Sequence, residues 1–517
     1  MAVGIADADK GDMTGVRTRA ARRILIEAGL LGVLADGALR NAPDGLGWTL
    51  WVVALALAAV NVARRAGLSV TREQIAWLGA AVACAAAFSW RDAEELRVAN
   101  VFGTLVALSM FAMSAAGLPA ASILVARVRD VVTAGVYTVR DLIAGAPMLM
   151  VRDAELHALP AVRRGASWTA VRAVLLTVPL VLVFTVLLSR ADPVFASVFR
   201  LPELDAELLL SHVLIAGAFA WWSAGWIRGA LLGVAQRPAL PERLPVRLGL
   251  GEVTTSLGAV IALFTIFVAL QLRWLFGGAE VVLATTGLTV AEYARRGFFE
   301  LVAVAALVLP LILVTRSLIE DEKVIRRHRQ LSLAMIVLLA PIMASALLRM
   351  QLYVGHFGLT TDRLYATALM LWLGLVFVAM ARTVLRGWAR PFAAMAMLSG
   401  FATVFTLNAL NPERLVARVN LGRSLGDHGV DYVYLARLSG DAAPAVVTAL
   451  EAAAPSPIAC KAAESLRTRW TRRQDTSWNL GARRGHASVM NNLSDADVQR
   501  LCAGAEVGVT SSPVPAP

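Results

Sequence analysis

Apolar segments separated by short polar connections fill most of the chain from residue 24 to residue 410. Each segment approaches the roughly 20 residues that an α-helix needs to cross a bilayer. The predicted segments are Ile24–Leu39, Gly47–Ala63, Ile75–Trp90, Val98–Gly117, Thr169–Leu188, Leu208–Ile227, Val253–Leu272, Gly297–Thr315, Leu331–Leu348, Tyr365–Ala381 and Pro391–Leu410. The pattern predicts an all-α fold, a polytopic integral membrane helical bundle with about eleven transmembrane helices.

The composition supports a membrane protein. Of the 517 residues, 58% are hydrophobic and only 17% are charged, which is far from the average of soluble proteins. A net charge of +12 would suggest a nucleic-acid partner in a soluble protein. Here the arginines lie in short connections between apolar segments, so the expected partner is the lipid bilayer and not nucleic acid.

The distribution of basic residues predicts the orientation, because cytoplasmic connections retain arginine and lysine. The connections on the side of the N-terminus hold more than twice as many basic residues as those on the other side. We therefore expect a multi-pass protein of the bacterial cytoplasmic (inner) membrane with its N-terminus in the cytoplasm. Eleven crossings then make the C-terminus extracytoplasmic.

Polar stretches divide the chain into five parts. We expect a disordered cytoplasmic N-terminus over residues 1–23, four transmembrane helices over 24–117, a cytoplasmic amphipathic connection over 118–168, seven transmembrane helices over 169–410, and a tail over 411–517. Apolar residues recur at helical spacing in the connection, with arginines and aspartates between them. Two arrangements fit this pattern: a helix in the membrane surface with its arginines facing lipid phosphates, or a helix packed under the bundle.

The tail is expected to form a small, mainly helical extracytoplasmic domain with a disordered end rich in proline and serine. The predicted features are a helix over Pro412–Arg423, a cap at Ser439–Pro444 leading into a helix over Ala445–Ala453, a basic helix around Ala462–Arg473, and a turn region at Trp478–Asn479. An oxidising compartment makes Cys460 and Cys502 candidates for a disulfide. The alternative is two buried free thiols.

Four stretches carry a resemblance to a known family. They are the polar connector Arg349–Tyr365, the segment Ala191–Phe195 with its Asp192-Pro193 pair, the segment Tyr293–Glu300, and Asn411-Pro412 continuing through Val419–Arg423. In these the chain resembles a family of bacterial polytopic membrane proteins described as domain of unknown function 4173 (DUF4153/DUF4173-like). The resemblance runs from roughly residue 170 to 440. It implies an integral membrane protein and no established activity.

Candidate ligand-binding or partner-binding residues lie on the outer side. Asp192 is a carboxylate at the end of the fifth segment, where a cation can bind; an Asp-Pro pair is also an ordinary helix stop. Arg296 and Glu300 share a helix face, with Tyr293 beside them, and form a charge ladder entering the membrane. The alternative for the ladder is solvation at the interface.

The connector adds three candidates at the membrane surface, namely Tyr353, Arg363 and Tyr365. Arginine with tyrosine suits recognition of an anion or a lipid headgroup. Basic and aromatic anchors are also ordinary at the ends of transmembrane helices. Both interpretations apply to this stretch.

The sequence contains no metal-binding spacing of histidines and cysteines, no glycine loop for phosphates and no nucleophile elbow. We therefore expect no cofactor, no metal and no enzymatic activity. The leading hypothesis is a regulatory or envelope-associated membrane protein that binds an envelope protein or lipid at its outer face. The alternative is a secondary transporter or permease with a site near Asp192, Arg296 and Glu300. A lipid-modifying enzyme that uses an outer carboxylate is the third hypothesis.

Overall fold

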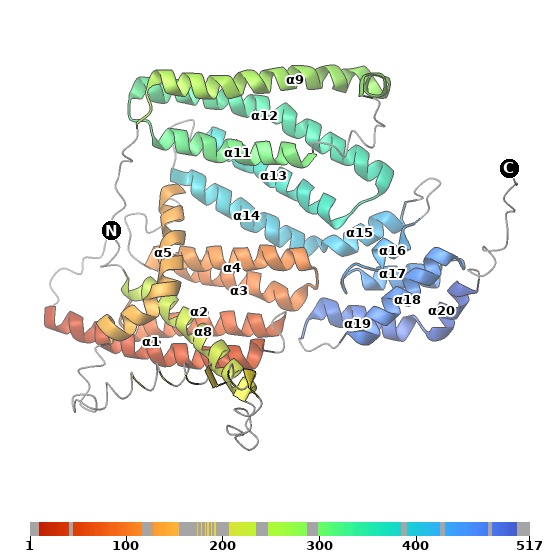
Figure 1. The fold of residues 1–517 in the computed structure, drawn as a ribbon. Coiled ribbons are helices and arrows are strands. Elements are labelled where there is room, and N and C mark those ends of the chain that lie inside the picture. The colour runs from red at the N-terminus through yellow and green to blue at the C-terminus, as the bar shows by residue number, and fades with distance from the viewer. Residues whose placement is uncertain are drawn as a thin grey trace, which may run out of the picture.

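The computed structural model (Figure 1) describes residues 10–40, 45–115, 126, 128–154, 206–233, 247–286, 298–383, 390–423, 430–473 and 478–503, with isolated positions between 173 and 192. Its described elements are all helices. The membrane half contains α1 (Lys10–Leu39), α2 (Leu46–Arg65), α3 (Arg72–Trp90), α4 (Glu94–Ala115), α5 (Val128–Met148), the π-helix η1 (Leu149–Asp153), α8 (Ala206–Leu232), α9 (Leu250–Thr286), α11 (Phe298–Ser317), α12 (Glu322–Phe357), α13 (Thr361–Arg382) and α14 (Arg390–Leu410). The protein is an all-α polytopic membrane protein.

The helices of the membrane half pack around two apolar cores. The first core is formed by α1 to α5 and α8, and the second by α9 and α11 to α13. Helix α14 lies between the two groups in Figure 1. Its first turns contribute Phe392 to the second core and Ala393 and Ala394 to the first, so α14 joins the two halves of the bundle.

Hydrogen bonds between helix ends show the direction of neighbouring helices. Thr49, at the start of α2, donates to the carbonyl of Ala85 near the end of α3 (2.8 Å). Gln74, at the start of α3, donates to the carbonyl of Ser114 at the end of α4 (3.1 Å). Neighbours in this group are therefore antiparallel, as expected for consecutive membrane crossings joined by short connections.

Eight of the described helices are long and apolar enough to cross a membrane. They coincide with eight of the predicted segments, from Gly47–Ala63 to Pro391–Leu410. The predicted segments Ile24–Leu39 and Ile75–Trp90 are helical but fall outside this set, and most of Thr169–Leu188 lies outside the described residues. Helix α1 carries charged side chains, such as Glu27, which accepts a hydrogen bond from Asn61 of α2. Since α1 and α3 lie alongside α2 and α4, we still expect both to cross.

Three helices extend further than the hydrophobic pattern predicted. Helix α1 begins at Lys10, so residues 10–23 are helical and not disordered; Arg17 is held by Asp153 (2.8 Å). Helix α9 continues to Thr286, well beyond the expected end at Leu272. Helix α12 continues through the first half of the polar connector and stops only at Gly358, which has φ 76°.

Helix α5 confirms that the connection over residues 118–168 contains a helix, and α5 crosses α8 in close backbone contact. A Cβ atom at Gly145 would lie 2.6 Å from the Cα of Gly225, and one at Gly225 would lie 2.2 Å from the carbonyl oxygen of Asp141. Any side chain at these positions would push the two helices apart. Figure 1 shows α5 running across the direction of α4 and α14.

We expect Gly225→Leu to destabilise the protein by about 1–3 kcal/mol, because the new leucine side chain would overlap the backbone of α5. Gly217→Leu on the same helix is the matched control, since a Cβ atom added at Gly217 would have no neighbour within 4 Å. The midpoint of thermal unfolding of the two purified variants measures the difference. Equal midpoints would contradict the close α5–α8 contact.

The tail is a compact helical domain. Its helices are α15 (Pro412–Leu421), α16 (Tyr432–Leu435), α17 (Ala443–Glu451), α18 (Pro457–Arg472), α19 (Leu480–Asn492) and α20 (Asp495–Cys502). They surround a core of their own in which Trp470 is fully buried. The first three predicted tail helices are present with shifted ends. Two further helices, α19 and α20, follow where only a turn region and a disordered end were expected, and residues 504–517 lie outside the described residues.

Candidate functional site

The seven predicted site residues fall into two groups. Tyr293 and Arg296 lie outside the described residues, so the proposed charge ladder is represented only by Glu300, which is exposed in the first turn of α11. Asp192 is also exposed, and its backbone N–H donates to the carbonyl of Leu188 (2.9 Å). Tyr353 and Arg363 lie together where α12 turns into α13, and Tyr365, further along α13, lies near Glu413 of the tail instead.

At this turn Arg363 contacts Tyr353 and the backbone. The Arg363 guanidinium lies 4.0 Å from the centre of the Tyr353 ring. The same side chain donates to the carbonyl oxygens of Phe357 (3.2 Å) and Gly358, which the end of α12 leaves without helical partners. Arg363 therefore caps the C-terminal end of α12, and its hydrogen bonds are made within the protein.

The tail domain forms hydrogen bonds with the same turn. The Asn420 side chain of α15 accepts a hydrogen bond from Leu359 N (2.8 Å) and donates to Leu359 O (2.7 Å). The hydroxyl of Tyr434 in α16 accepts from the backbone N–H of Thr361 (3.1 Å). Arg423 donates to the carbonyl of Val354 (3.0 Å). The connector is thus a docking point for the tail.

A second docking point is the short connection between α3 and α4. The Asp92 carboxylate accepts hydrogen bonds from both terminal nitrogens of Arg473 (2.9 and 2.8 Å), from Gly440 N (2.9 Å) and from Arg97 (3.1 Å). In return the backbone N–H of Asp92 donates to the Asp441 carboxylate (2.6 Å). The two aspartates therefore each bind the backbone segment that carries the other.

The end of α14 completes this contact. Arg91 donates to the carbonyl of Asn408 (2.7 Å) and pairs with Asp441 at 3.5 Å. Asn411, with φ 56°, caps α15 and also donates to Asp441 (3.3 Å). On the other side Asn479, which caps α19, donates to the carbonyl of Arg91 (2.9 Å). We call these contacts, between residues 91–92, the end of α14 and the tail, the junction.

Burial and hydrogen bonding act in opposite directions on the junction carboxylates. Burial alone would raise the pKa of Asp92, but the hydrogen bonds from Arg473 and Gly440 outweigh it, and the pKa lies below its ordinary value. For Asp441, burial dominates over the hydrogen bond from Asp92 N and the charge of Arg91, and the pKa is raised. Asp92 is therefore the more strongly ionised of the two.

Glu413, in the first turn of α15, lies beside the junction and is almost fully buried. Burial raises its pKa to about 7, although Ser439 N donates to the carboxylate (2.5 Å); nearby Glu95 and Asp441 raise the pKa further. The neighbouring Tyr365 hydroxyl is buried and has no hydrogen-bond partner among the described residues. Glu413 therefore titrates close to neutral pH.

The stability of the protein should fall as the pH rises from about 4.5 to about 7, because folded Glu413 keeps a proton that the unfolded chain releases. The stabilising contribution of protonated Glu413 is fully present below pH 4.5 and is lost as the pH rises to about 7. The free energy of unfolding then falls by about 3 kcal/mol in total. Glu413→Gln should remove this dependence and be the more stable form at pH 8, as measured by thermal unfolding. Exposed Glu464→Gln is the matched control. Parallel pH profiles of wild type and Glu413→Gln would contradict the assignment.

Most junction residues were not among the sequence-based candidates. Arg91, Asp92, Asp441, Arg473 and Asn479 were absent from that set. An Arg-Asp pair in a connection of three residues is the one local signal, since so short a turn leaves its charges close to the membrane surface. The stretch Asn411-Pro412 through Arg423, which carried the family resemblance, does contribute Asn411 to the junction and Asn420 and Arg423 to the contact with the connector.

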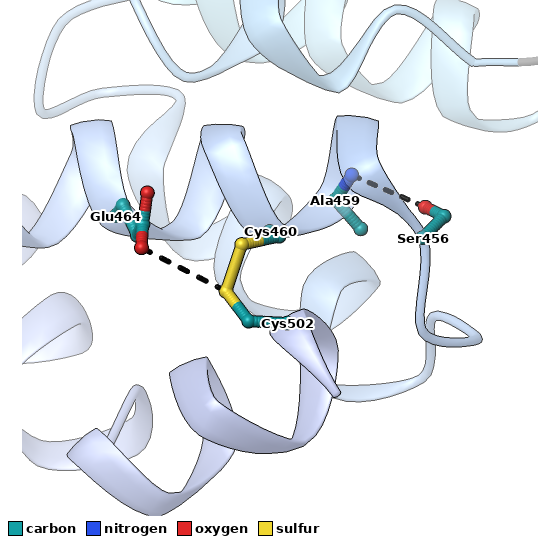
Figure 2. The surroundings of a disulfide bond; sticks show 5 residues. All are labelled: Ser456, Ala459, Cys460, Glu464 and Cys502. Carbon is teal, nitrogen blue, oxygen red and sulfur yellow. Dashed lines mark hydrogen bonds between the residues drawn. A yellow bond between two sulfur atoms is a disulfide. The ribbon is translucent and has the colours of Figure 1, made fainter. Parts of the chain in front are cut away.

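The tail also contains a disulfide between Cys460 of α18 and Cys502 of α20 (Figure 2), the first of the two alternatives considered for these residues. Glu464 lies beside it, with Oε1 3.8 Å from the sulfur of Cys502. Ser456 caps α18 by accepting from Ala459 N (3.2 Å). While the two sulfurs are bonded to each other, neither offers a thiolate to a metal.

Residues 78–449 match the protein family described as Domain of unknown function (DUF4153), and the chain belongs to this family. The matched region spans α4 to α14, most of α3 and the tail as far as α17, so it includes both docking points. The family number 4173 and a bacterial origin stay predictions. Searches of curated proteins and of solved structures give no significant match.

Proposed function

We propose that this integral membrane protein has a regulatory or envelope-associated role and displays its tail domain outside the cell membrane as the surface that binds an envelope protein or lipid. One observation carries the proposal. The tail binds the connection after α3 and the turn between α12 and α13, so the tail and the bundle form one body. A partner bound to such a tail acts directly on the membrane helices.

An extracytoplasmic tail is supported by the contacts at the two ends of α1. Arg17, near its start, donates to the carbonyl of Leu232 at the end of α8 (3.2 Å). The start of α2 lies beside the tail, where Leu46 N donates to the carbonyl of Trp478 (3.0 Å). The tail thus lies at the end of the bundle opposite the start of α1. The start of α1 is rich in arginine, so the positive-inside rule assigns that end to the cytoplasm and the end with the tail to the other side. A disulfide is likewise expected in an oxidising compartment.

Site-specific photocrosslinking in intact cells tests the proposal. A photoreactive residue at Ile458, which is half exposed on α18, should form an adduct with a discrete protein or lipid. The adduct should fall at least fivefold in Asp92→Ala, in which the junction is broken. A probe at Leu263, exposed on the membrane helix α9, is the control for bulk lipid.

Two outcomes would count against the proposal. No adduct from the exposed surface of the tail would remove the binding role, and an adduct unaffected by Asp92→Ala would show a tail that acts independently of the bundle. A transporter would instead show substrate protection of cysteines placed at Asp192, Arg296 and Glu300. That labelling experiment separates the two functions.

A further inference from the structure

Helix α5 lies at the end of the bundle opposite the tail. The π-helix that continues it places Asp153 between Arg17 of α1 (2.8 Å) and Arg228 of α8 (2.6 Å). The carbonyl of Ala154 accepts from Arg22 (3.2 Å). α5 is not among the helices apolar enough to cross the membrane, and it runs across the spans in Figure 1. It is therefore fixed to the helix ends at one membrane surface.

The face of α5 that packs on the bundle contains small and polar residues. Ala134, Tyr137, Thr138, Asp141 and Gly145 are buried there, against α8 and α4. A soluble amphipathic helix buries its apolar face and exposes its polar face. In α5 the arrangement is the opposite, so the described part of the chain leaves the most hydrophobic side of this helix exposed.

That uncovered side is a continuous apolar stripe. Val132, Val136, Val139 and Ile143 are spaced four, three and four residues apart, and each is 57–66% exposed. Residues at this spacing lie above one another along a helix. The stripe is roughly 17 Å long at 1.5 Å per residue.

The exposed charges beside the stripe are positive. Arg129 and Arg140 flank it on the same side of the helix, with side chains 47% and 33% exposed. Two acids of this region are buried: the side chains of Asp141 and Asp153 are 3% and 2% exposed and are paired with arginines. Asp130, which follows Arg129 and pairs with it at 3.6 Å, is 28% exposed, but at this position it lies on the side of the helix away from the stripe. An apolar stripe bordered by arginines on a helix in the membrane plane is the pattern of interfacial helices, which bind acyl chains and headgroup phosphates together.

We propose that α5 is an interfacial helix whose apolar stripe enters the bilayer surface and whose Arg129 and Arg140 bind the phosphates of anionic lipids. The bilayer fits better than a protein partner because the arginines lie on the flank where headgroups lie when the valines reach the acyl chains. The inference is independent of the function proposed for the tail. It concerns the opposite membrane surface.

The depth of the stripe is measured on the full-length protein in phosphatidylcholine bilayers containing phosphatidylglycerol. An environment-sensitive fluorophore on Val136→Cys should be quenched by nitroxides carried on the lipid and not by aqueous iodide. Leu263→Cys on α9 and Lys461→Cys on the tail, both at exposed positions, are the lipid and water controls. Quenching by iodide as at Lys461, or by neither reagent, would overturn the proposal.

The charge is tested by native mass spectrometry of retained phosphatidylglycerol. Arg129→Gln with Arg140→Gln should weaken retention about fivefold for each arginine removed, from the contribution of one basic residue near an anionic surface. Arg64→Gln with Arg65→Gln, both exposed at the end of α2, is the matched control. Equal losses in the two double variants would show a general charge effect and overturn the specific role of α5.

If Arg129→Gln with Arg140→Gln fails to fold, the fluorescence measurement still decides, because it keeps both arginines. In that case quenching at Val136 in bilayers with and without phosphatidylglycerol replaces the retention measurement. Deeper burial of the fluorophore with phosphatidylglycerol supports the lipid-phosphate contact. Equal depth in the two bilayers contradicts it.

Discussion

Asp92→Ala will weaken the docking of the tail on the bundle. The substitution leaves Arg473, Arg97 and Gly440 N without the carboxylate that binds all three. Because Asp92 is 4% exposed, the loss should destabilise the docked tail by about 3–5 kcal/mol, the cost of breaking a buried ion pair on one side. The rate at which tail fragments appear during limited trypsin digestion of the purified protein measures this effect.

The matched control is Asp495→Ala, which removes an aspartate whose side chain is 81% exposed and paired with Arg467 at 2.7 Å. This exposed pair should contribute less than about 1 kcal/mol. Asp92→Ala combined with Arg473→Ala should be less destabilising than the sum of the single changes, since neither charge is then left alone. A digestion rate for Asp92→Ala equal to wild type would contradict the junction.

Loss of the disulfide should have the next largest effect. Cys460 and Cys502 are 42 residues apart. Closing a loop of that size lowers the entropy of the unfolded tail, which stabilises the folded tail by about 4 kcal/mol. Cys502→Ser should therefore lower the thermal unfolding midpoint of the tail, and α20 should exchange its amide hydrogens faster. Hydrogen exchange followed by mass spectrometry resolves this helix from the rest of the tail.

A chemical version of the same experiment provides its control. A membrane-permeant reductant should lower the unfolding midpoint of wild type to that of Cys460→Ser with Cys502→Ser, and should leave this double variant unchanged. Maleimide should label the two thiols only after reduction. A reductant effect of equal size in the double variant would mean that the midpoint reports something other than this bond.

The membrane helices were predictable because burial in lipid requires long apolar segments whatever the neighbours are. The predicted segment Pro391–Leu410 differs by one residue from α14 (Arg390–Leu410). The end of α12 was not predictable from the same signal. Arg349–Phe357 is polar enough to indicate water, but polarity does not end a helix, and the backbone continues until Gly358.

The contacts of the junction could not be predicted from local sequence patterns, for a different reason. Nothing near Asp92 in the sequence indicates Gly440 or Arg473 as partners, because the pairing is decided by how the whole bundle packs. The missed tail helices did carry local signals. Ser494 and Asp497 form a capping box at the start of α20, and Asn479 caps α19, so attention to caps would have found both helices.

The Asp92–Asp441 contact also affects how the chain is made. Its two residues are 349 positions apart, so at roughly 5–20 residues per second about 20–70 s of synthesis separate them. During that time the α3–α4 hairpin is complete while the groups that bind its connection have not yet emerged. A ribosome that stops before residue 440 therefore leaves a recognisable marker, an unoccupied Arg91-Asp92 turn, by which incomplete chains differ from finished ones.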